Sequence, residues 1–317
     1  MADNSSTSNF KLVKEIIIVL VMLFIADYAV GSLLKWMFYQ QTIGWEPMII
    51  ESVERTTDDI IVFGSSYANS QYDSKIIEEE SGLTCYNAGI PGQSLIYATA
   101  VQECMLSRYT PKLFIVDISP KDLVLRETRP DYIRLNVLLP FVRDYDIGDI
   151  VFKRNKFERF KVISRIYPYN SMIIGFLLNW GKKDKFYKGY QPFDTKLTQE
   201  RLDEVLKSSF GDELNQELEL DPYKVEIFHR FINNAKESGS KVVFVISPKI
   251  FKYGSNWILE YIKEEVEKSG TELIDWKYHE DFLVVEEYRD IHHLNRIGAS
   301  RFSRELTKEL KIRNCFQ

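Results

Sequence analysis

Cysteine is scarce in this chain, and histidine is nearly as scarce. Among 317 residues there are three cysteines, Cys85, Cys104 and Cys315, none in C-x-x-C spacing, and four histidines, two of them adjacent. A disulfide framework needs paired cysteines, and a structural zinc site needs Cys or His ligands at short spacing. The sequence therefore predicts no disulfide framework, no metal site and no cofactor, and we expect the cysteines to behave as small apolar residues.

An excess of positive charge is also lacking. The chain has 41 Lys and Arg against 46 Asp and Glu, a net charge of -5. A nucleic-acid surface needs a basic stripe that neutralises phosphates, and the sequence contains none interleaved with aromatic residues. We therefore expect no nucleic-acid partner. The apolar fraction of 45% is sufficient for a buried core, in one large domain or two smaller ones.

One long apolar run is present near the start. Residues 16–34 read IIIVLVMLFIADYAVGSLL and contain a single ionisable group, Asp27. A helix needs about 20 apolar residues to cross a hydrocarbon core about 30 Å thick. Lys35 and Trp36 follow the run, as is typical of a membrane interface. The sequence predicts a transmembrane anchor over residues 15–37, which would contact membrane lipid.

Two other interpretations of this run are a cleaved signal peptide and a buried core helix. No A-x-A-like cleavage site follows the run, and its apolar character continues past Asp27. A charged residue at a helix centre costs roughly 2.5 to 3.5 kcal/mol on insertion scales, so we expect Asp27 to face a partner helix or a polar interface. Lys11 and Lys14 before the run balance Lys35 and Arg55 after it, so charge does not determine the orientation.

Beyond about residue 57, strand and helix patterns alternate. Short apolar runs typical of buried strands cover 59–63, 83–87, 112–119, 241–247 and 271–276. Amphipathic segments lie between them, starting at Asp73 or Ser74, Ser94, Asp221 and Trp257. Such alternation is typical of a mostly parallel sheet covered by helices on both faces. The sequence predicts an α/β fold, a three-layer α/β/α sandwich.

Residues from about 122 to 220 interrupt this alternation. They are rich in aromatic and basic residues and contain no clear strand. One interpretation is a helical insertion that covers an edge of the sheet, and the other is a lid over the strand ends, where α/β proteins bind ligands. The predicted layout is a tail over 1–14, the anchor over 15–37, a linker over 38–57 and a domain over 58–317 that contains the insertion.

The stretch IIVFGSSYANS, residues 60–70, places Ser65 and Ser66 directly after a strand, at the edge where parallel sheets bind ligands. On its own it is more typical of a connecting turn. A serine nucleophile needs a base, and the base needs a group that orients it. Asp290 and His293 lie three residues apart in a turn before a helix expected to begin within 298–300. At that spacing the carboxylate can reach Nδ1 of the imidazole and leave Nε2 for the serine.

Three of these motifs together resemble a known family. FGSSYA after a strand, YNAGIPGQS one unit later and DIHHLN near the end resemble the first, second and last motif blocks of the SGNH/GDSL hydrolases, whose fold is flavodoxin-like. The resemblance covers roughly residues 58–121 and 240–310. The anchor and the motifs IRLNVLLPF and ISRIYPYNS also resemble a membrane-anchored group of such proteins from Bacteroides-type bacteria, of unassigned substrate. That resemblance implies a domain on the periplasmic or extracytoplasmic side of the cytoplasmic membrane.

The resemblance also implies roles for individual residues. Ser66 matches the nucleophile, and Ser65 occupies the position usually held by Asp. Asp290 and His293 match the D-x-x-H pair, which makes the adjacent His292 a bystander. The backbone N–H groups of Ser66 and Gly89 match donors of the oxyanion hole.

One family feature is missing. The third motif block supplies an Asn side chain to the oxyanion hole, but the corresponding strand end here reads VDISPKD. Losing one such donor typically costs about 10²- to 10³-fold in rate. Asn87, Ser119 or the backbone near Ser119 can be considered as replacements. Alternatively, Asn87 caps its own turn and Asp117 and Ser119 form a hydrogen-bonded turn at a strand end.

Two functions are therefore open from the sequence. The first is a serine esterase or O-acyltransferase that uses Ser66, His293 and Asp290 on small acyl esters, with O-acetyl groups of cell-surface polysaccharide as the expected substrate. The second is a catalytically silent scaffold of the same fold that binds glycan or a membrane acyltransferase. The expected partners are an acylated glycan or small ester, membrane lipid, and a membrane protein that contacts Asp27.

Overall fold

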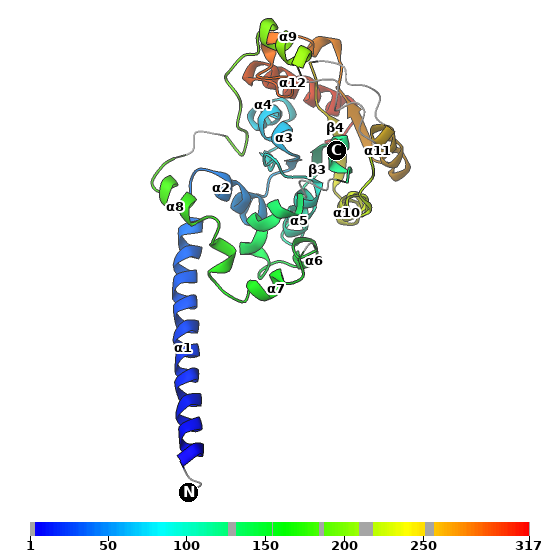
Figure 1. Ribbon diagram of the computed structural model, residues 1–317. Helices are drawn as coiled ribbons and strands as arrows, with labels where there is room; N and C mark the ends of the chain where they lie inside the picture. Colours follow the sequence, from blue (N-terminus) through cyan, green and yellow to red (C-terminus); the bar gives the residue numbers. More distant parts are fainter. Residues whose placement is uncertain are drawn as a thin grey trace. The chain divides into compact units, whose positions relative to one another are not determined.

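The computed structural model describes residues 4–125, 131–153, 155–183, 187–208, 218–250 and 257–316. The chain divides into two compact units, of which the first comprises residues 1–47 and 136–184 and the second residues 48–135 and 185–317. Figure 1 shows the helices and strands in chain order. Parts of the predicted insertion, residues 126–130, 154, 184–186 and 209–217, lie outside the described residues.

The second unit is built on a five-stranded parallel sheet with the order β2-β1-β3-β4-β5. The strands are β1 (Ile60–Phe63), β2 (Cys85–Asn87), β3 (Leu113–Asp117), β4 (Lys241–Ile246) and β5 (Glu272–Asp275). All four neighbouring pairs are parallel, and β3 and β4 are seen side by side in Figure 1. The prediction of an α/β fold with a parallel sheet is confirmed, because each predicted apolar run contains one of these strands.

The helices of this unit alternate with the strands. They are α3 (Ser66–Gln71), α4 (Ser74–Ser81), α5 (Leu95–Leu106), α9 (Gln199–Ser208), α10 (Pro222–Ser238), α11 (Trp257–Ser269) and α12 (Arg296–Ile312). Of the two starts that the sequence left open for α4, Asp73 is the N-cap, and its side chain accepts the N–H groups of Lys75 and Ile76. The predicted start of α12 within 298–300 is wrong. Asn295 accepts the N–H groups of Ile297 and Gly298, so the helix begins at Arg296.

Alternate strand residues pack against different helices. One set forms a buried cluster with side chains of α3, α4 and α12, and its strand members are Ile60, Val62, Cys85, Leu113, Ile115, Val243, Val245 and Ile274. The other set includes Phe63 and Phe114, which contact Phe231 of α10, and Phe244, which contacts Phe228. Burying one such side chain contributes about 1.5 to 3 kcal/mol. This packing fixes the ends of the strands, where the candidate site lies.

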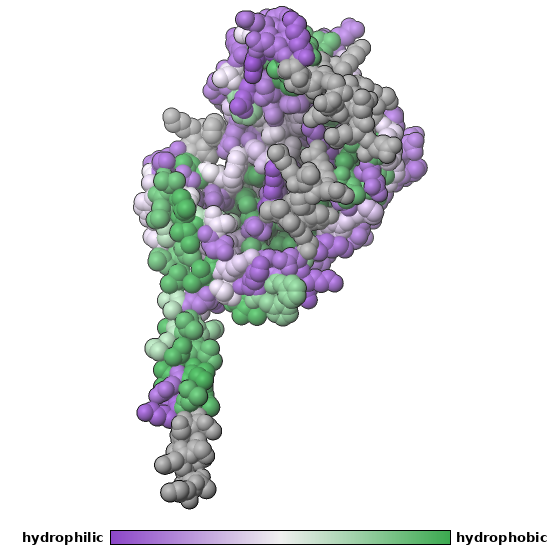
Figure 2. Space-filling view, viewed as in Figure 1, coloured by the Kyte–Doolittle hydropathy of each residue, from purple (hydrophilic) through white to green (hydrophobic). Residues whose placement is uncertain are grey.

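The first unit combines the anchor helix with the middle of the insertion. Its elements are α1 (Asn4–Tyr39), α6 (Gly148–Val151), α7 (Glu158–Lys161), η4 (Tyr167–Tyr169) and α8 (Ile173–Asn179). Phe38 of α1 is fully buried among the rings of Phe141, Tyr169 and Phe176. From Phe10 to Tyr39, α1 is long and apolar enough to cross a membrane. Figure 2 shows hydrophobic residues along the visible face of this helix.

The stretch predicted as a linker, residues 38–57, is folded. After the end of α1 it forms α2 (Trp45–Ile50) and a π-helical turn, η1 (Glu51–Arg55). Met48, Ile49, Ile50 and Val53 are buried. Because these apolar side chains of the two helical elements are buried, the stretch is part of the folded structure and is not an extended tether.

The predicted insertion divides between the two units. Residues 136–184 belong to the first unit, whereas residues 187–197 run along the second. There the Asn87 N–H donates to the Lys188 carbonyl and the Gln191 N–H donates to the Asn69 carbonyl. The described part of the insertion adds no strand to the main sheet. Residues 187–197, here called the return segment, therefore lie beside the end of β2 and reach the candidate site.

Candidate active site

The turn after β1 is sharp and requires glycine. Gly64 has a φ of +148°, and a Cβ there would lie 2.8 Å from Cβ of Ala68 and 3.0 Å from Cβ of Asp117. Helix α3 then begins at Ser66, with Ser65 as its N-cap residue. The backbone N–H of Ser66 lies in the first helical turn, where N–H groups have no acceptor within the helix. The turn thus presents both the hydroxyl and the N–H of Ser66 at the carboxyl end of the strand.

Ser66, His293 and Asp290 form a hydrogen-bonded chain. Oγ of Ser66 lies 2.8 Å from Nε2 of His293, although the two residues are 227 positions apart. Nδ1 of His293 lies 3.0 Å and 3.1 Å from the two carboxylate oxygens of Asp290. Because the carboxylate accepts the proton on Nδ1, Nε2 carries the lone pair and accepts the serine O–H. The structure therefore brings these three predicted residues within direct contact.

The turn that carries Asp290 is held by its own backbone. Oδ1 of Asp290 also accepts the N–H groups of His292 at 2.8 Å and His293 at 2.9 Å, and the Arg289 N–H donates to the His293 carbonyl. Burial raises the pKa of Asp290, but the hydrogen bond and charge of His293, with these N–H groups, lower it to about 2. Asp290 is therefore ionised near pH 7 and fixed in position.

His293 is enclosed by two aromatic rings. The ring of Tyr67 stacks on the imidazole at 5.1 Å between centroids, and the ring of Phe193 meets it edge-on at 5.6 Å. Nζ of Lys249 lies 3.2 Å from the centroid of Tyr67, and the Arg289 guanidinium lies 3.8 Å from that of Phe193. Each ring therefore binds a cation and packs against the imidazole. These contacts leave 18% of the His293 side chain exposed.

The sequence did not predict the four residues around His293, which are Tyr67, Phe193, Lys249 and Arg289. Lys249 follows the end of β4, so the rule that ligands bind at strand ends was a usable signal for it. Tyr67 is adjacent to Ser66, and Arg289 is adjacent to Asp290. Phe193 lies in the return segment of the insertion and had no pattern to mark it. It reaches the imidazole only because the segment 187–197 folds back along the second unit.

The residues considered for the oxyanion hole make other hydrogen bonds. The Gly89 N–H donates to Oδ1 of Asn87 at 3.0 Å, and Nδ2 of Asn87 donates to the carbonyls of Ala68 and Tyr72 at 2.7 Å and 2.9 Å. Both the N–H and the hydroxyl of Ser119 donate to Asp122 at 2.9 Å. Asn87 and Ser119 thus occupy the turn and capping arrangements that the sequence left as the alternative.

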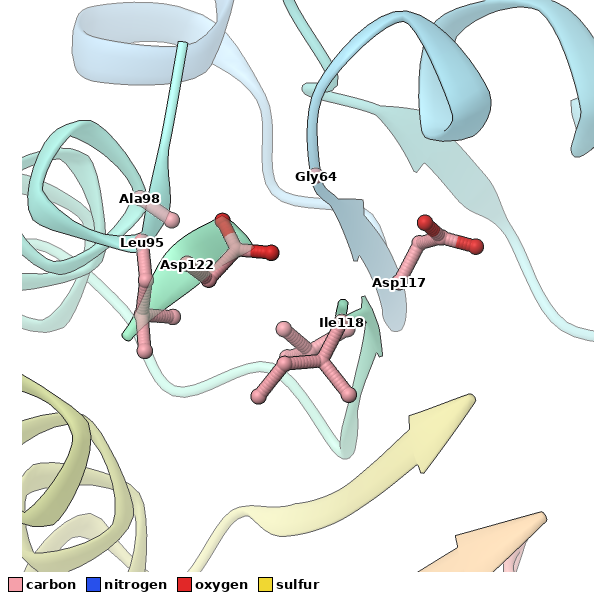
Figure 3. Close-up of a pocket in the computed structure, with 7 residues that line it drawn as sticks. Gly64, Leu95, Ala98, Asp117, Ile118 and Asp122 are labelled. Carbon is pink, nitrogen blue, oxygen red and sulfur yellow. The ribbon is translucent and has the colours of Figure 1, made fainter. Parts of the chain in front are cut away.

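A small hollow lies next to the end of β1. It is lined by Gly64, Leu95, Ala98, Val116, Asp117, Ile118 and Asp122. Figure 3 shows Asp122 beside Leu95 and Ala98 of α5, whereas the Asp117 carboxylate points away from them. The Tyr72 hydroxyl donates to Asp117 at 2.7 Å, and burial raises the pKa of Asp117. Both carboxylates therefore have partners outside the Ser66 hydrogen-bonded chain.

His292 differs from its neighbour. Burial, followed by the charges of Lys121 and Lys249, lowers the pKa of His292 to about 4, so its imidazole is neutral near pH 7. The Ser66 hydroxyl bonds to His293 and not to this residue. Among the described residues, no group of three or more His, Cys, Asp or Glu side chains could hold a metal ion. Cys85, Cys104 and Cys315 are all buried with free thiols.

No protein-family model and no curated protein matches the chain. Among the solved structures that are similar to it, two have a TM-score of 0.35. One is a gut microbial diltiazem-metabolizing enzyme, 12% identical, with the similarity covering 78% of this chain and 47% of that one, so this chain spans about half its length. The other is a carbohydrate acetylesterase from Sinorhizobium meliloti, 8% identical, covering 80% of this chain and 98% of that one. Similarity at this level carries no argument about function, which rests on the geometry of the site.

Proposed function

We propose that the chain is a serine esterase or O-acyltransferase of the SGNH/GDSL hydrolase type, with a three-layer α/β/α sandwich that carries Ser66 as nucleophile. The observation that supports this most strongly is the chain of contacts from Ser66 to His293 at 2.8 Å and from His293 to Asp290 at 3.0 Å. A hydroxyl, a base and an orienting carboxylate in this order are the parts that acyl transfer requires.

In the proposed reaction, Oγ of Ser66 attacks the ester carbonyl while Nε2 of His293 takes the hydroxyl proton. The imidazolium that forms is stabilised by the ionised Asp290, and it then protonates the departing alcohol oxygen, which leaves an acyl-enzyme. Water or an acceptor hydroxyl next attacks the acyl carbonyl as His293 takes its proton. Return of that proton to Oγ of Ser66 releases the acid or the new ester.

The negative charge on the carbonyl oxygen needs N–H donors. We assign this role to the backbone N–H of Ser66 at the start of α3, with Gly89 as the second donor. The Gly89 N–H also donates to Asn87, so substrate must share or displace that bond. With the family's Asn absent from the third block, we expect turnover about 10²- to 10³-fold below that of an enzyme with a full set of donors.

The proposed substrates are small acyl esters, in particular O-acetyl groups of cell-surface polysaccharide. Two features support this choice, the resemblance of the motif blocks and an N-terminal helix long and apolar enough to anchor the chain in a membrane. We place the catalytic domain on the periplasmic or extracytoplasmic side on the same resemblance.

A catalytically silent scaffold is the second candidate. It is favoured by one observation, that the Gly89 N–H, the Asn87 amide and the Ser119 hydroxyl are all hydrogen-bonded within the protein. A scaffold for glycan or for a membrane acyltransferase would not need a free oxyanion hole.

Hydrolysis of p-nitrophenyl acetate by the full chain in detergent distinguishes the two functions. The matched variants are Ser66→Ala and Ser65→Ala, because Ser65 is adjacent and its side chain makes no capping bond to the described first turn of α3. We expect turnover by the wild type and by Ser65→Ala, and background hydrolysis by Ser66→Ala. Background hydrolysis by the wild type would favour the scaffold, and activity that survives Ser66→Ala would remove Ser66 from its role.

A further inference from the structure

The surroundings of α1 change at Asp27. Between Phe10 and Ala26 the side chains of the helix are exposed. At Asp27, Oδ1 accepts the Ser164 hydroxyl at 2.5 Å and Oδ2 accepts the Arg165 N–H at 2.8 Å. From this level to Phe38 one side of α1 packs against the insertion, within the first unit. Of the two surroundings expected for Asp27, a partner helix or a polar interface, its own chain thus supplies the second.

The uncovered part of α1 is too short to cross a bilayer. The apolar residues from Ile16 to Ala26 span about 16 Å at 1.5 Å per residue, whereas a hydrocarbon core is about 30 Å thick. Extending the span backwards would place Lys14 and Glu15 in hydrocarbon, which is costly. A bilayer around α1 must therefore continue past Asp27 by roughly 14 Å, close to Trp36. This is the level at which the insertion packs on the helix.

The insertion exposes large apolar side chains at that level. Phe157, Phe160 and Ile163 are 72%, 63% and 73% exposed. Ile163 is adjacent to Ser164, whose bond to Asp27 fixes the height of this segment along α1. Figure 2 shows a hydrophobic patch where Figure 1 labels α7. Single exposed apolar residues are ordinary on soluble surfaces, but three within seven positions form a patch.

A second exposed group lies further along α1. Ile174, Leu177 and Leu178 of α8 are exposed, and the ring of Trp180 contacts that of Trp36 at 5.5 Å. Trp36 lies about 13 Å beyond Asp27 along the helix. Tryptophans at this height are typical of the boundary between acyl chains and head groups.

The charge of the insertion also suits the boundary between acyl chains and head groups. Residues 136–184 contain nine Lys and Arg and five Asp and Glu, a net charge of +4, although the whole chain carries -5. Lys156, Arg159 and Lys161 alternate with the exposed Phe157 and Phe160. Exposed aromatic residues interleaved with basic ones are typical of helices that lie in the interface of an anionic membrane.

We propose that the first unit is embedded in one leaflet of a lipid bilayer, beside α1. Residues 157–163 and 174–180 contact acyl chains and the interface, and the neighbouring Lys and Arg side chains contact anionic phosphate head groups. The hydrogen bonds from Ser164 and Arg165 keep Asp27 out of contact with lipid. The proposal depends on α1 as the membrane span and is independent of catalysis by Ser66.

Single labels measure this directly, because the three native cysteines are buried and an introduced exposed cysteine reacts first. Ile163→Cys is compared with Ile312→Cys, since the two side chains are similarly exposed at 73% and 75% and Ile312 belongs to the second unit. The full chain carrying a bimane label is reconstituted in vesicles of phosphatidylcholine and phosphatidylglycerol. Its emission is then quenched with doxyl-acyl lipid or with aqueous iodide.

We expect the label at position 163 to lose most of its emission to doxyl lipid and little to iodide, and the label at position 312 to show the reverse. Equal quenching of both labels by iodide would overturn the proposal. Protection of position 163 from both quenchers would also overturn it, because it would indicate a protein partner on this surface. Hydrolysis of p-nitrophenyl acetate by the same preparations separates these outcomes from failure of the proposed activity.

Discussion

Two serines follow neighbouring strands of the sheet and differ in what their hydroxyls bind. Ser66 comes after β1 and Ser119 after β3, and the two strands pair in parallel register. Ser66 bonds to the imidazole of His293, contributed from near the end of the chain, whereas Ser119 bonds to Asp122, three residues on. Position at a strand end gives both hydroxyls access to the same edge. Only the one with a base as partner can become a nucleophile.

The local structure explains the difference. Asp122 accepts both the N–H and the hydroxyl of Ser119, which is the N-cap residue of the short helix Pro120–Asp122. These two bonds hold the Ser119 hydroxyl in place. His293 is instead positioned by Asp290 and by the rings of Tyr67 and Phe193, so its Nε2 is available to take a proton.

The largest expected effect separates the two serines by activity. Ser66→Ala should lower kcat for p-nitrophenyl acetate by about 10⁶-fold, to the background rate, because loss of the nucleophile removes the acyl-enzyme route. Ser119→Ala should keep wild-type turnover. Steady-state kinetics on both variants check this. Equal losses of kcat in the two variants would show that the Ser66 and Ser119 hydroxyls do not differ in their effect on turnover.

The next effect concerns the orienting carboxylate. Asp290→Asn should keep the fold but lower kcat by up to about 10⁴-fold, because an amide does not hold the imidazole in the required tautomer. The matched control is His292→Gln, which alters the adjacent ring and should leave kcat near the wild-type value. A wild-type kcat for Asp290→Asn would show that Asp290 does not orient His293.

Asn87→Ala should act on stability more than on the chemical step. Its buried side chain makes three hydrogen bonds, and their loss removes one partner from each of the Ala68 and Tyr72 carbonyls and from the Gly89 N–H, at a cost of about 3 kcal/mol in the free energy of unfolding. Thermal unfolding followed by circular dichroism measures this. Loss of kcat in protein that remains fully folded would instead identify Asn87 as an oxyanion donor and would weaken the parallel with Ser119.

Ser119→Ala should lower the free energy of unfolding by about 1 kcal/mol, the usual net contribution of one hydrogen bond, because the variant loses the bond from the hydroxyl to Asp122. Ser65→Ala is the matched control, because Ser65 is also an N-cap residue and its side chain makes no capping bond to the described turn that follows it. If the two variants lost equal stability, the contribution of the bond from Ser119 to Asp122 would be contradicted.

The smallest effect depends on pH. Because the folded-state pKa of Asp290, about 2, lies below its ordinary value, its stabilising contribution is present above that ordinary value and is lost as the pH falls towards 2. Since its side chain is 40% exposed, we expect about 1 kcal/mol after allowance for screening. The stability difference between wild type and Asp290→Asn should therefore be larger at pH 6 than at pH 3. A constant difference would contradict this assignment.

The sequence predicted the sheet well because its strands are continuous apolar runs that bury completely. It also predicted the contact between Ser66 and His293, 227 positions apart, because the motifs that carry them resemble the first and last blocks of one family. Two other contacts between distant segments had no such motif. Ser164 reaches Asp27 from 137 positions away, and Phe193 reaches the imidazole through a loop that folds back. The sequence did not predict the helical elements within residues 38–57, because that stretch is short and lies between the long apolar run and the first strand pattern.

In the proposed reaction His293 activates the Ser66 hydroxyl. The rate of modification by a small fluorophosphonate tests this activation, with the modified residue identified by peptide mass spectrometry in the full chain and in His293→Ala. We expect a single adduct on Ser66 in the wild type and a rate near background in His293→Ala. A folded wild-type protein that leaves Ser66 unmodified, or an equal rate in the two proteins, would show that His293 does not activate Ser66.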